Sequence, residues 1–492
     1  MKNLTFIEET MNSNYTKVAV KNDIHSNHRD SLQNLIHYLS LRSIDIRKMQ
    51  NELHTVGLSS LTSSESHILR QVQEVKMRLG KKYSPTKLSK LTETKAGEIF
   101  QSRIHKLFGQ NNGSNFPFIM VTCDKSFAED YAFIKSLLLK GMNVARINCA
   151  HDNPEIWSGL IHLIKKACIK TGKTCKIYMD LAGPKIRTQI LSKRKHTKKP
   201  LAMGQLIWLT EQMNATFGKD LVINPGIPDL IGQLRKGERV WIDDGLIQGV
   251  IEHVDTEKAA VRITRIAGEK KKIKEDKGIN LPDSNLNIAS LTTFDIECLP
   301  FISQNADMVG YSFVKTPGDL ALLRKEFAEQ NLKQPNIIVK IETIQAVNNL
   351  PSILLEGMKD PSFGVMIARG DLAVEIGFER TGEIQEEILW LCEAAHVPVI
   401  WATQVLESLN KSGVATRSEI TDAAHAAAAD CVMLNKGPHT IEVLETLNEI
   451  IKRTTEHKNK KRYLFRTLKI AKDYIQKLQD ESPVLQEEKS RT

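Results

Sequence analysis

The feature that most constrains the fold is a regular alternation, from Phe116 to about Ile450, of short β-branched runs with segments of helical periodicity. This pattern is typical of βα units around a parallel sheet. Eight units predict an α/β fold, the TIM (β/α)₈ barrel. A doubly wound open sheet is the alternative, but no G-x-G-x-x-G follows any of the runs. The predicted strands are FPFIMVT (116–122), MNVARIN (142–148), KIYMDL (176–181), ADMVGYSF (306–313), NIIVKIE (336–342), FGVMIARGD (363–371), VPVIWAT (397–403) and DCVMLN (430–435).

The segment between the third and fourth strands has a different character. Residues 188–283 hold Gly and Pro turn signals and short alternating strands such as RVWIDDG and VRITRIAG. They predict a small β domain, a lid, inserted after strand 3 into a barrel built from residues 116–187 and 284–453. Residues 1–115 carry apolar residues at helical spacing, which predicts an N-terminal helical extension. Residues 454–492 predict a basic helical tail.

Composition narrows the class of protein. Hydrophobic residues make up 41% and charged residues 26% of the 492 residues, and no apolar stretch approaches the 18 residues of a membrane span. The start, MKNLTFIEETMNSNYTK, lacks the apolar core of a signal peptide, so we expect a cytoplasmic protein without a membrane partner. The seven cysteines form no C-x-x-C pair, which disfavours a zinc site or a disulfide framework.

The formal net charge of +10 comes largely from three runs, at 193–199, 270–274 and 458–462. Nucleic-acid binding is one interpretation. Solvated loops and a basic tail are the other. Because no aromatic residues interleave with these runs as a stacking platform requires, we expect no nucleic-acid partner.

Polar residues gather at the predicted strand ends, where TIM barrels carry their catalytic groups. Each alone has an ordinary interpretation: a salt bridge for Arg146 or Asp180, a helix start for Glu342, and a cap for Thr403. Their occurrence on adjacent strands favours a shared site. The strand-end residues are Arg146 and Asn148, Asp180, Lys340 and Glu342, Arg369 with Gly370 and Asp371, and Thr403.

This set suits phosphoryl transfer. Glu342 and Asp371 are hard oxygen ligands on neighbouring strands, and Mg²⁺ takes one or two carboxylates together with substrate oxygens. Arg146 offers a planar fork for a phosphate, and Lys340 offers a compact charge beside the metal. A metal and two cations are sufficient, because this reaction is catalysed mainly by positioning and charge neutralisation.

Several segments resemble the pyruvate kinase family, in the order that family has. The most specific are VKIET (339–343), MIARGDLAVEI (366–376) and WATQVLESL (401–409). GMNVARINCAH (141–151) and MDLAGPKIRT (179–188) resemble its phosphate-binding strand and the entrance to its mobile domain. VWIDDGLI (240–247) and KGINLPD (277–283) resemble the core and exit of that domain.

The resemblance implies roles for individual residues. Lys340 would neutralise the transferring phosphoryl group, Arg146 would grip it, and Glu342 with Asp371 would hold Mg²⁺, which Mn²⁺ can replace. The backbone of Gly370 and Asp371, with Thr403, would hold the substrate carboxylate, and Thr403 would lie near the protonated carbon. The residues implied for the nucleotide are Asn148, His151, Arg187 and Lys277, the last reaching its phosphates on lid closure.

Departures from the family pattern carry further expectations. Asn148 and Asp180 of a potassium site remain, but its serine is Ala150, and Lys185 replaces the glutamate of G-P-E-I-R. An ammonium at Lys185 would supply the charge of K⁺, so we expect activity without K⁺. The eighth unit is shortened, with Asn435-Lys436-Gly437-Pro438 in place of S-G-E-T, which leaves nucleotide choice open.

No regulatory C-terminal domain follows residue 454 in the sequence, so we expect no sugar-phosphate regulation there and no oligomer through that domain. The function that the resemblance implies is transfer of a phosphoryl group from phosphoenolpyruvate to ADP, giving pyruvate and ATP in glycolysis. The alternatives are a Mg²⁺-dependent lyase of phosphoenolpyruvate or oxoacids, and a degenerate sensor of phosphorylated ligands. Retention of Lys277 disfavours the lyase, since a lyase needs no nucleotide clamp.

Overall fold

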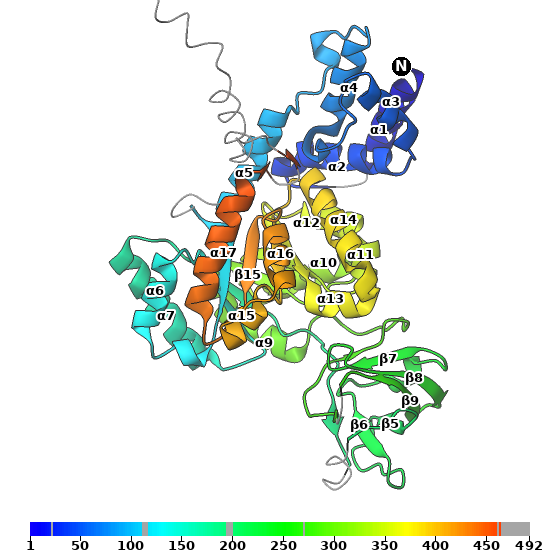
Figure 1. The fold of residues 1–492 in the computed structure, drawn as a ribbon, viewed down its shortest axis with the longest axis vertical. Helices are drawn as coiled ribbons and strands as arrows, with labels where there is room; N and C mark the ends of the chain where they lie inside the picture. The colour runs from blue at the N-terminus through cyan, green and yellow to red at the C-terminus, as the bar shows by residue number, and fades with distance from the viewer. Residues whose placement is uncertain (21–22, 111–116, 193–199, 269–270, 460–461, 464–492) are drawn as a thin grey trace, which may run out of the picture.

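The computed structural model describes residues 1–20, 23–110, 117–192, 200–268, 271–459 and 462–463. At its centre the described strands close into an eight-stranded parallel barrel in the order β1-β15-β14-β13-β12-β11-β3-β2 (Figure 1). This confirms the predicted TIM barrel. The strands are β1 (Phe118–Cys123), β2 (Val144–Asn148), β3 (Lys176–Asp180), β11 (Met308–Tyr311), β12 (Asn336–Ile341), β13 (Phe363–Ala368), β14 (Val399–Ala402) and β15 (Cys431–Leu434).

Helices surround the barrel and begin where the sequence supplies caps. Asn153 accepts a hydrogen bond from the Ile156 amide (3.1 Å) at the start of α7, and Thr292 forms a capping box with Asp295 at the start of α9. The helices are α6 (Tyr131–Leu139), α7 (Pro154–Thr171), α9 (Thr293–Asn305), α10 (Pro317–Glu329), α11 (Ile344–Asn348), α12 (Leu350–Gly357), α13 (Arg369–Ile376), α14 (Thr381–Ala394), α15 (Glu407–Ser412), α16 (Arg417–Ala426) and α17 (Thr440–Thr455).

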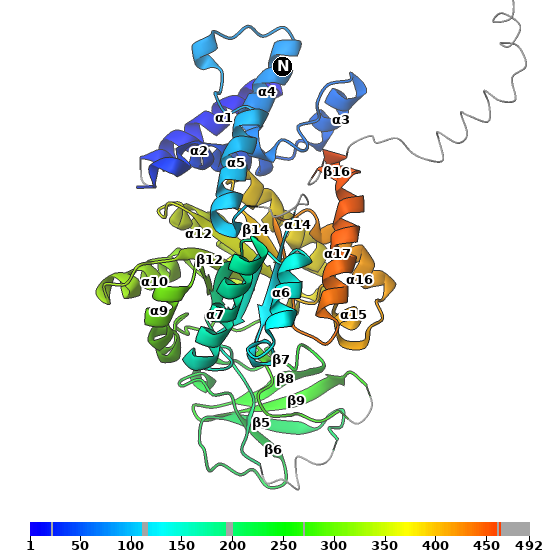
Figure 2. The same ribbon diagram turned by 90° about the vertical axis from the view of Figure 1, so that its left-hand side faces the viewer.

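The lid (residues 188–283) is inserted between β3 and β11, as predicted, and has a sheet of its own in the order β10-β7-β8-β9-β5-β6-β4. Its strands bury a separate apolar core that includes Ile207, Val261 and Ile263. The lid projects from the end of the barrel opposite the N-terminal helices (Figure 2). Its strands are β4 (Gln189–Ile190), β5 (Leu206–Thr210), β6 (Leu221–Asn224), β7 (Arg239–Ile242), β8 (Ile247–Val254), β9 (Lys258–Ile266) and β10 (Ile279–Asn280).

The N-terminal extension is helical, as predicted, and it closes the floor of the barrel. Leu107 and Phe108 of α5 belong to one buried cluster with the inward side chains of the barrel strands, including Phe118 and Ile338. Rings of Phe108 and Phe118 lie 5.6 Å apart. Phe118 and Ile338 lie in the first half of β1 and β12, so α5 fills the N-terminal end of the barrel. The helices are α1 (Lys2–Ala19), α2 (Arg29–Arg42), α3 (Arg47–Thr55), α4 (Ile68–Arg78) and α5 (Glu93–Phe108).

The tail requires a correction. Helix α17 ends at Thr455, residues 456–457 form a turn, and the described residues beyond it form two short antiparallel strands, β16 (Lys458–Asn459) and β17 (Arg462–Tyr463), not a helix. Like charges four residues apart, such as Lys458 and Arg462, disfavour helix. The rest of the predicted tail, 460–461 and 464–492, and the basic run 193–199 lie outside the described residues. Among the described helices, none has both the length and the hydropathy to cross a membrane.

The barrel floor generates a stability prediction. Leu107 is completely buried, and Leu107→Ala leaves a cavity between α5 and the strands, so it should lower the free energy of unfolding by about 2–5 kcal/mol. Urea denaturation measures this change. Ile169→Ala, at a site 82% exposed on α7, is the control and should change stability by less than about 0.5 kcal/mol. A change of similar size in the two variants would mean that α5 does not support the barrel.

Candidate active site

The predicted polar residues lie at the C-terminal ends of the barrel strands, the end that faces the lid (Figure 2). Arg146, Asp180 and Lys340 lie within β2, β3 and β12. Glu342 follows β12 directly, and Thr403 follows β14. Residues 369–371, predicted as a strand end, instead form the first turn of α13, so Gly370 and Asp371 present helix N-terminal amides.

A buried carboxylate joins two of the predicted cations. Asp180 is 1% exposed, and its Oδ2 accepts hydrogen bonds from Arg146 Nε (3.0 Å) and Nη2 (2.6 Å). Lys340 Nζ lies 3.3 Å from Asp180 Oδ1, and the Tyr178 hydroxyl donates to the same oxygen (3.0 Å). Burial opposes ionisation of Asp180, but the charges of Lys340 and Arg146 outweigh it and lower the pKa of this carboxyl.

Lys340 is held on its other side by Glu342 and Ser312. Its ammonium lies 3.2 Å from Glu342 Oε1 and donates to Ser312 Oγ (2.6 Å). Burial disfavours the charged lysine, yet Asp180 and Glu342 outweigh that effect and raise the pKa of Lys340. Burial raises the pKa of Glu342; Lys340 offsets part of this rise, and the charge of Asp371 adds to it.

Glu342 and Asp371 follow neighbouring parallel strands, β12 and β13. Because two nearby carboxylates repel each other, a cation between them would relieve the repulsion. Asp371 Oδ1 is buried, and apart from the ammonium of Lys185 it has no donor among the described residues. No cluster of three or more His, Cys, Asp or Glu side chains occurs within that part of the chain. Two carboxylates are a donor set that fits Mg²⁺, which rarely occupies an all-protein cage and takes its remaining ligands from water and substrate.

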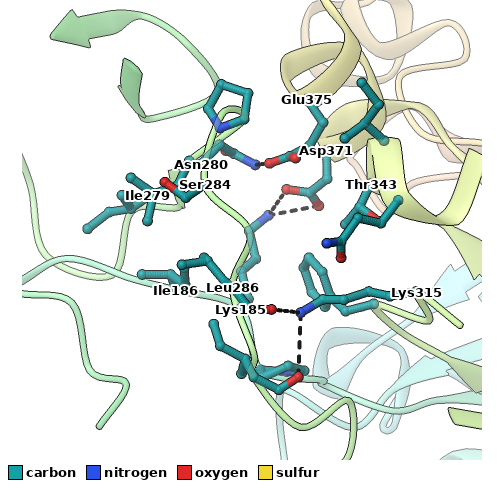
Figure 3. Close-up of a pocket in the computed structure, with 17 residues that line it drawn as sticks. Lys185, Ile186, Ile279, Asn280, Ser284, Leu286, Lys315, Thr343, Asp371 and Glu375 are labelled. Carbon is teal, nitrogen blue, oxygen red and sulfur yellow. Dashed lines mark hydrogen bonds and ion pairs between the residues drawn. The ribbon is translucent and has the colours of Figure 1, made fainter. Parts of the chain in front are cut away.

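Lys185 forms an ion pair with the Asp371 carboxylate. Its ammonium is 2.7 Å from Asp371 Oδ1 and 3.0 Å from Oδ2 (Figure 3). The sequence-based hypothesis placed this charge as a substitute for K⁺ beside Asn148 and Asp180, but the contact that the structure gives Lys185 is with Asp371. The surrounding cavity lies between the lid and the barrel and is also lined by Asn280, Lys315 and Glu375.

Thr403 is held in a strained conformation. Its φ of +67° is unusual for a β-branched residue, and strain of this kind clusters at functional sites. Its Oγ1 accepts a hydrogen bond from the Gly370 amide (2.9 Å) at the start of α13. Arg369 Nε donates to the Ala402 carbonyl (2.9 Å), which ties α13 to the end of β14. The hydroxyl of Thr403 therefore keeps its proton free to donate, next to helix N-terminal amides.

The four residues predicted to bind a nucleotide fall into two groups. Asn148 and His151 line a cavity beside Arg146 at the barrel mouth, together with Lys436. Arg187 and Lys277 belong to the lid side, where Lys277 Nζ lies 3.0 Å from Asp243 and Arg187 lies 3.4 Å from Asp276. In the structure, Arg187 and Lys277 therefore pair with acidic residues of the lid. They do not line the cavity that Asn148 and His151 line.

The connection after β15 forms a closed turn. Asn410 Nδ2 donates to the Asn435 carbonyl (2.6 Å), and Thr440 Oγ1 donates to the Gly437 carbonyl (2.7 Å). A Cβ on Gly437 would lie 2.4 Å from Asn410 Oδ1, so only glycine fits. Lys436 extends from this turn and forms an ion pair with Asp124 after β1.

Comparison with known proteins now decides the family. Residues 119–439, most of the chain, match the family described as pyruvate kinase, barrel domain. The chain belongs to the pyruvate kinase family. It is 33% identical to the pyruvate kinase of Bacillus licheniformis over 345 residues, 68% of this chain and 57% of that one. It is also 33% identical to the Dictyostelium discoideum pyruvate kinase over 362 residues, 72% of this chain and 69% of the relative.

A crystal structure of a pyruvate kinase from Cryptosporidium parvum superimposes with a TM-score of 0.63 at 27% identity, covering 72% of this chain and 73% of that one. The chain spans little more than half the length of some relatives, 57% for Bacillus licheniformis and 54% for Staphylococcus haemolyticus. Family and fold are therefore established.

Sequence reasoning missed several residues that shape this site. Ser312 contacts Lys340, Thr122 accepts from Arg146 Nη1 (3.0 Å), and Tyr178 contacts Asp180. Ser312 and Thr122 lie at the ends of predicted strands, so the strand-end rule would have found both had it been applied to small hydroxyl residues. Glu375, one helical turn beyond Asp371, carried no comparable sequence signal.

Glu375 generates a prediction on pH dependence. Burial raises its pKa from an ordinary 4.5 to about 7, although Asn280 donates to its carboxylate (3.1 Å). The folded state thus binds this proton more tightly than the unfolded chain, so the free energy of unfolding falls as pH rises from about 4.5 to about 7. Glu375→Gln keeps an acceptor for Asn280 and removes the charge. It should be more stable than the parent above pH 7, by up to about 3 kcal/mol, and nearly equal at pH 5.

Urea denaturation at several pH values measures this difference. Glu297→Gln, at an exposed position on α9, is the matched control and should show no pH-dependent gain. A stability difference between Glu375→Gln and the parent that stays constant from pH 5 to pH 8 would contradict the assignment.

Proposed function

We propose that this chain is a Mg²⁺-dependent pyruvate kinase that transfers a phosphoryl group from phosphoenolpyruvate to ADP, the step that yields pyruvate and ATP in glycolysis. The observation that carries the proposal is the buried ammonium of Lys340, held 3.3 Å from Asp180 and 3.2 Å from Glu342. A buried lysine kept charged at the mouth of a barrel is suited to neutralise a phosphoryl group in transfer.

Arg146 and Lys340 would bind the phosphoryl oxygens from two sides. Asp180 supports this role because it orients both cations. Burial strengthens the electrostatic attraction of these cations for a phosphoryl group. Glu342 and Asp371 would hold Mg²⁺, which Mn²⁺ can replace and which supplies further neutralisation of phosphoryl charge. The chemistry of this carboxylate pair, two hard oxygen ligands after neighbouring strands, supports the proposed metal.

The start of α13 would bind the substrate carboxylate. The amides of Gly370 and Asp371 point from a helix N-terminus, where anions are stabilised. The Thr403 hydroxyl accepts a hydrogen bond from the Gly370 amide and can still donate its own proton. It would donate toward the carboxylate and, through water, toward the enolate carbon that becomes the methyl group of pyruvate.

The nucleotide would lie between the barrel mouth and the lid. Asn148 and His151 line the cavity on the barrel side. Arg187 and Lys277 would approach from the lid when it closes, and Lys277 would then exchange Asp243 for a nucleotide phosphate. The cavity beside Arg146 supports ADP as the acceptor.

The decisive test is pyruvate formation from phosphoenolpyruvate and ADP with Mg²⁺. Lys340→Met should lower kcat/KM by at least about 10², because it removes a charge that stabilises the transition state. Lys325→Met, on α10 with a side chain 64% exposed, is the control and should turn over as the parent does. Absence of pyruvate from the folded parent would contradict the proposal. Breakdown of phosphoenolpyruvate without ADP would favour a lyase. Nucleotide binding without turnover would favour a sensor.

We further propose that turnover needs no K⁺. The Asp180 carboxylate already receives Arg146, Lys340 and Tyr178, so little negative charge is left beside Asn148 for a monovalent ion. Lys185 adds a second internal cation at the same end of the barrel, where it pairs with Asp371 when no metal is bound.

Replacing K⁺ by tetramethylammonium at matched ionic strength should change turnover by less than about twofold. Lys185→Glu, which introduces the residue of the G-P-E-I-R motif, is the matched comparison and should gain stimulation by K⁺. Strong K⁺ stimulation of the parent protein would refute this proposal while leaving the kinase assignment intact.

A further inference from the structure

The lid joins the barrel through two chain segments that are bonded to each other, here called the hinge segments (residues 184–188 and 277–281). Arg187 and Gly278 form an antiparallel bridge. The Ile279 amide donates to the Ile186 carbonyl (2.9 Å), and the Thr188 amide donates to the Lys277 carbonyl (2.8 Å). A displacement of one hinge segment is therefore transmitted to the other.

Each hinge segment has a polar contact with helix α13. Lys185 of the first segment meets Asp371 (2.7 Å to Oδ1, 3.0 Å to Oδ2), and Asn280 Nδ2 of the second donates to Glu375 (3.1 Å). Figure 3 shows the two contacts one above the other across the cavity. Asp371 and Glu375 are four residues apart and so share one face of α13. This helix thus tethers the base of the lid at two points.

The first tether uses a carboxylate that the proposed function needs for another purpose. The ammonium of Lys185 faces both oxygens of Asp371. A divalent ion bound to an Asp371 oxygen, at about 2.1 Å, would lie close to this ammonium. Two cations at such a separation repel each other. The Lys185 side chain is 24% exposed, so it has a path toward water.

We infer that Lys185 is a displaceable internal cation: it leaves Asp371 when a divalent cation binds between Glu342 and Asp371, and this releases one of the two tethers of the lid. The inference rests on the metal site of the proposed function. Two consequences follow. Lys185 weakens binding of the metal, and metal binding loosens the hinge. By linkage, anything that draws the lid away from α13 favours the metal to the same degree.

The test uses Mn²⁺ alone with the full chain, and electron paramagnetic resonance of free Mn²⁺ gives the affinity. Lys185→Met and Lys185→Gln should bind Mn²⁺ at least about tenfold tighter than the parent, since each removes a competing charge. Lys185→Arg keeps the charge and should stay close to the parent. Asp371→Asn should abolish binding at this site.

A matched control comes from the other end of the barrel. Lys176, at the start of β3, pairs with Asp307 at 2.8 Å, and its side chain is 33% exposed. Lys176→Met removes a similar lysine–aspartate pair and should leave the Mn²⁺ affinity unchanged. A gain in affinity equal to that of Lys185→Met would indicate a general effect of net charge and would overturn the inference.

Amide hydrogen exchange of the hinge segments supplies the second measurement. In the parent, Mn²⁺ should accelerate exchange in residues 184–188 because one tether is lost. In Lys185→Met, exchange there should be fast without metal and respond little to it. Equal Mn²⁺ affinity in parent and Lys185→Met, or slower exchange of the parent hinge with Mn²⁺, would refute the inference. Neither readout needs turnover, so failure of the pyruvate assay is a separate outcome.

Discussion

The arrangement of the site depends on one buried charge, the carboxylate of Asp180. An ionised carboxylate that is 1% exposed costs several kcal/mol unless it is paired and hydrogen-bonded. Arg146 from the adjacent strand β2 and Lys340 from β12, beyond β11 on the other side, meet this requirement. On the neighbouring strand β11, Gly310 leaves room for the Asp180 carboxylate because it has no side chain. A Cβ on Gly310 would lie 2.4 Å from Asp180 Oδ1. The positions of both cations thus follow from the need to compensate one anion.

The two ends of the barrel interior have opposite character because strand side chains alternate with a period of two. On β12, Ile338 lies in the apolar floor beside α5, and Lys340, two residues on, points into the same interior at the lid end. Tyr178 and Asp180 of β3 repeat the pattern. One apolar layer therefore supports one charged layer, and α5 keeps water from reaching the charged layer from below.

Much of this could be predicted from the sequence because it is periodic. Eight βα units define the barrel, turn-rich strands after the third unit define the lid, and the strand-end rule points to Arg146, Asp180 and Lys340. The features that the sequence did not predict do not depend on a periodic pattern of residues. The partner of Lys185 depends on how a hinge segment approaches α13, and Ser312 is a small residue with no charge to draw notice. Nothing in the amphipathic pattern of residues 93–108 distinguishes a helix that seals a barrel from one that lies on its side.

The place of α5 in the chain has a consequence for biosynthesis. This helix leaves the ribosome before any barrel strand, and domains begin to fold from the N-terminal side during synthesis. Its apolar face is then available as each strand emerges, and Phe118 of β1, the first to arrive, contacts it directly. The barrel closes only when β15 pairs with β1, after the other seven barrel strands have been synthesised. Until then β1 presents an unpaired edge, and the nascent chain is most exposed to association with its neighbours during that interval.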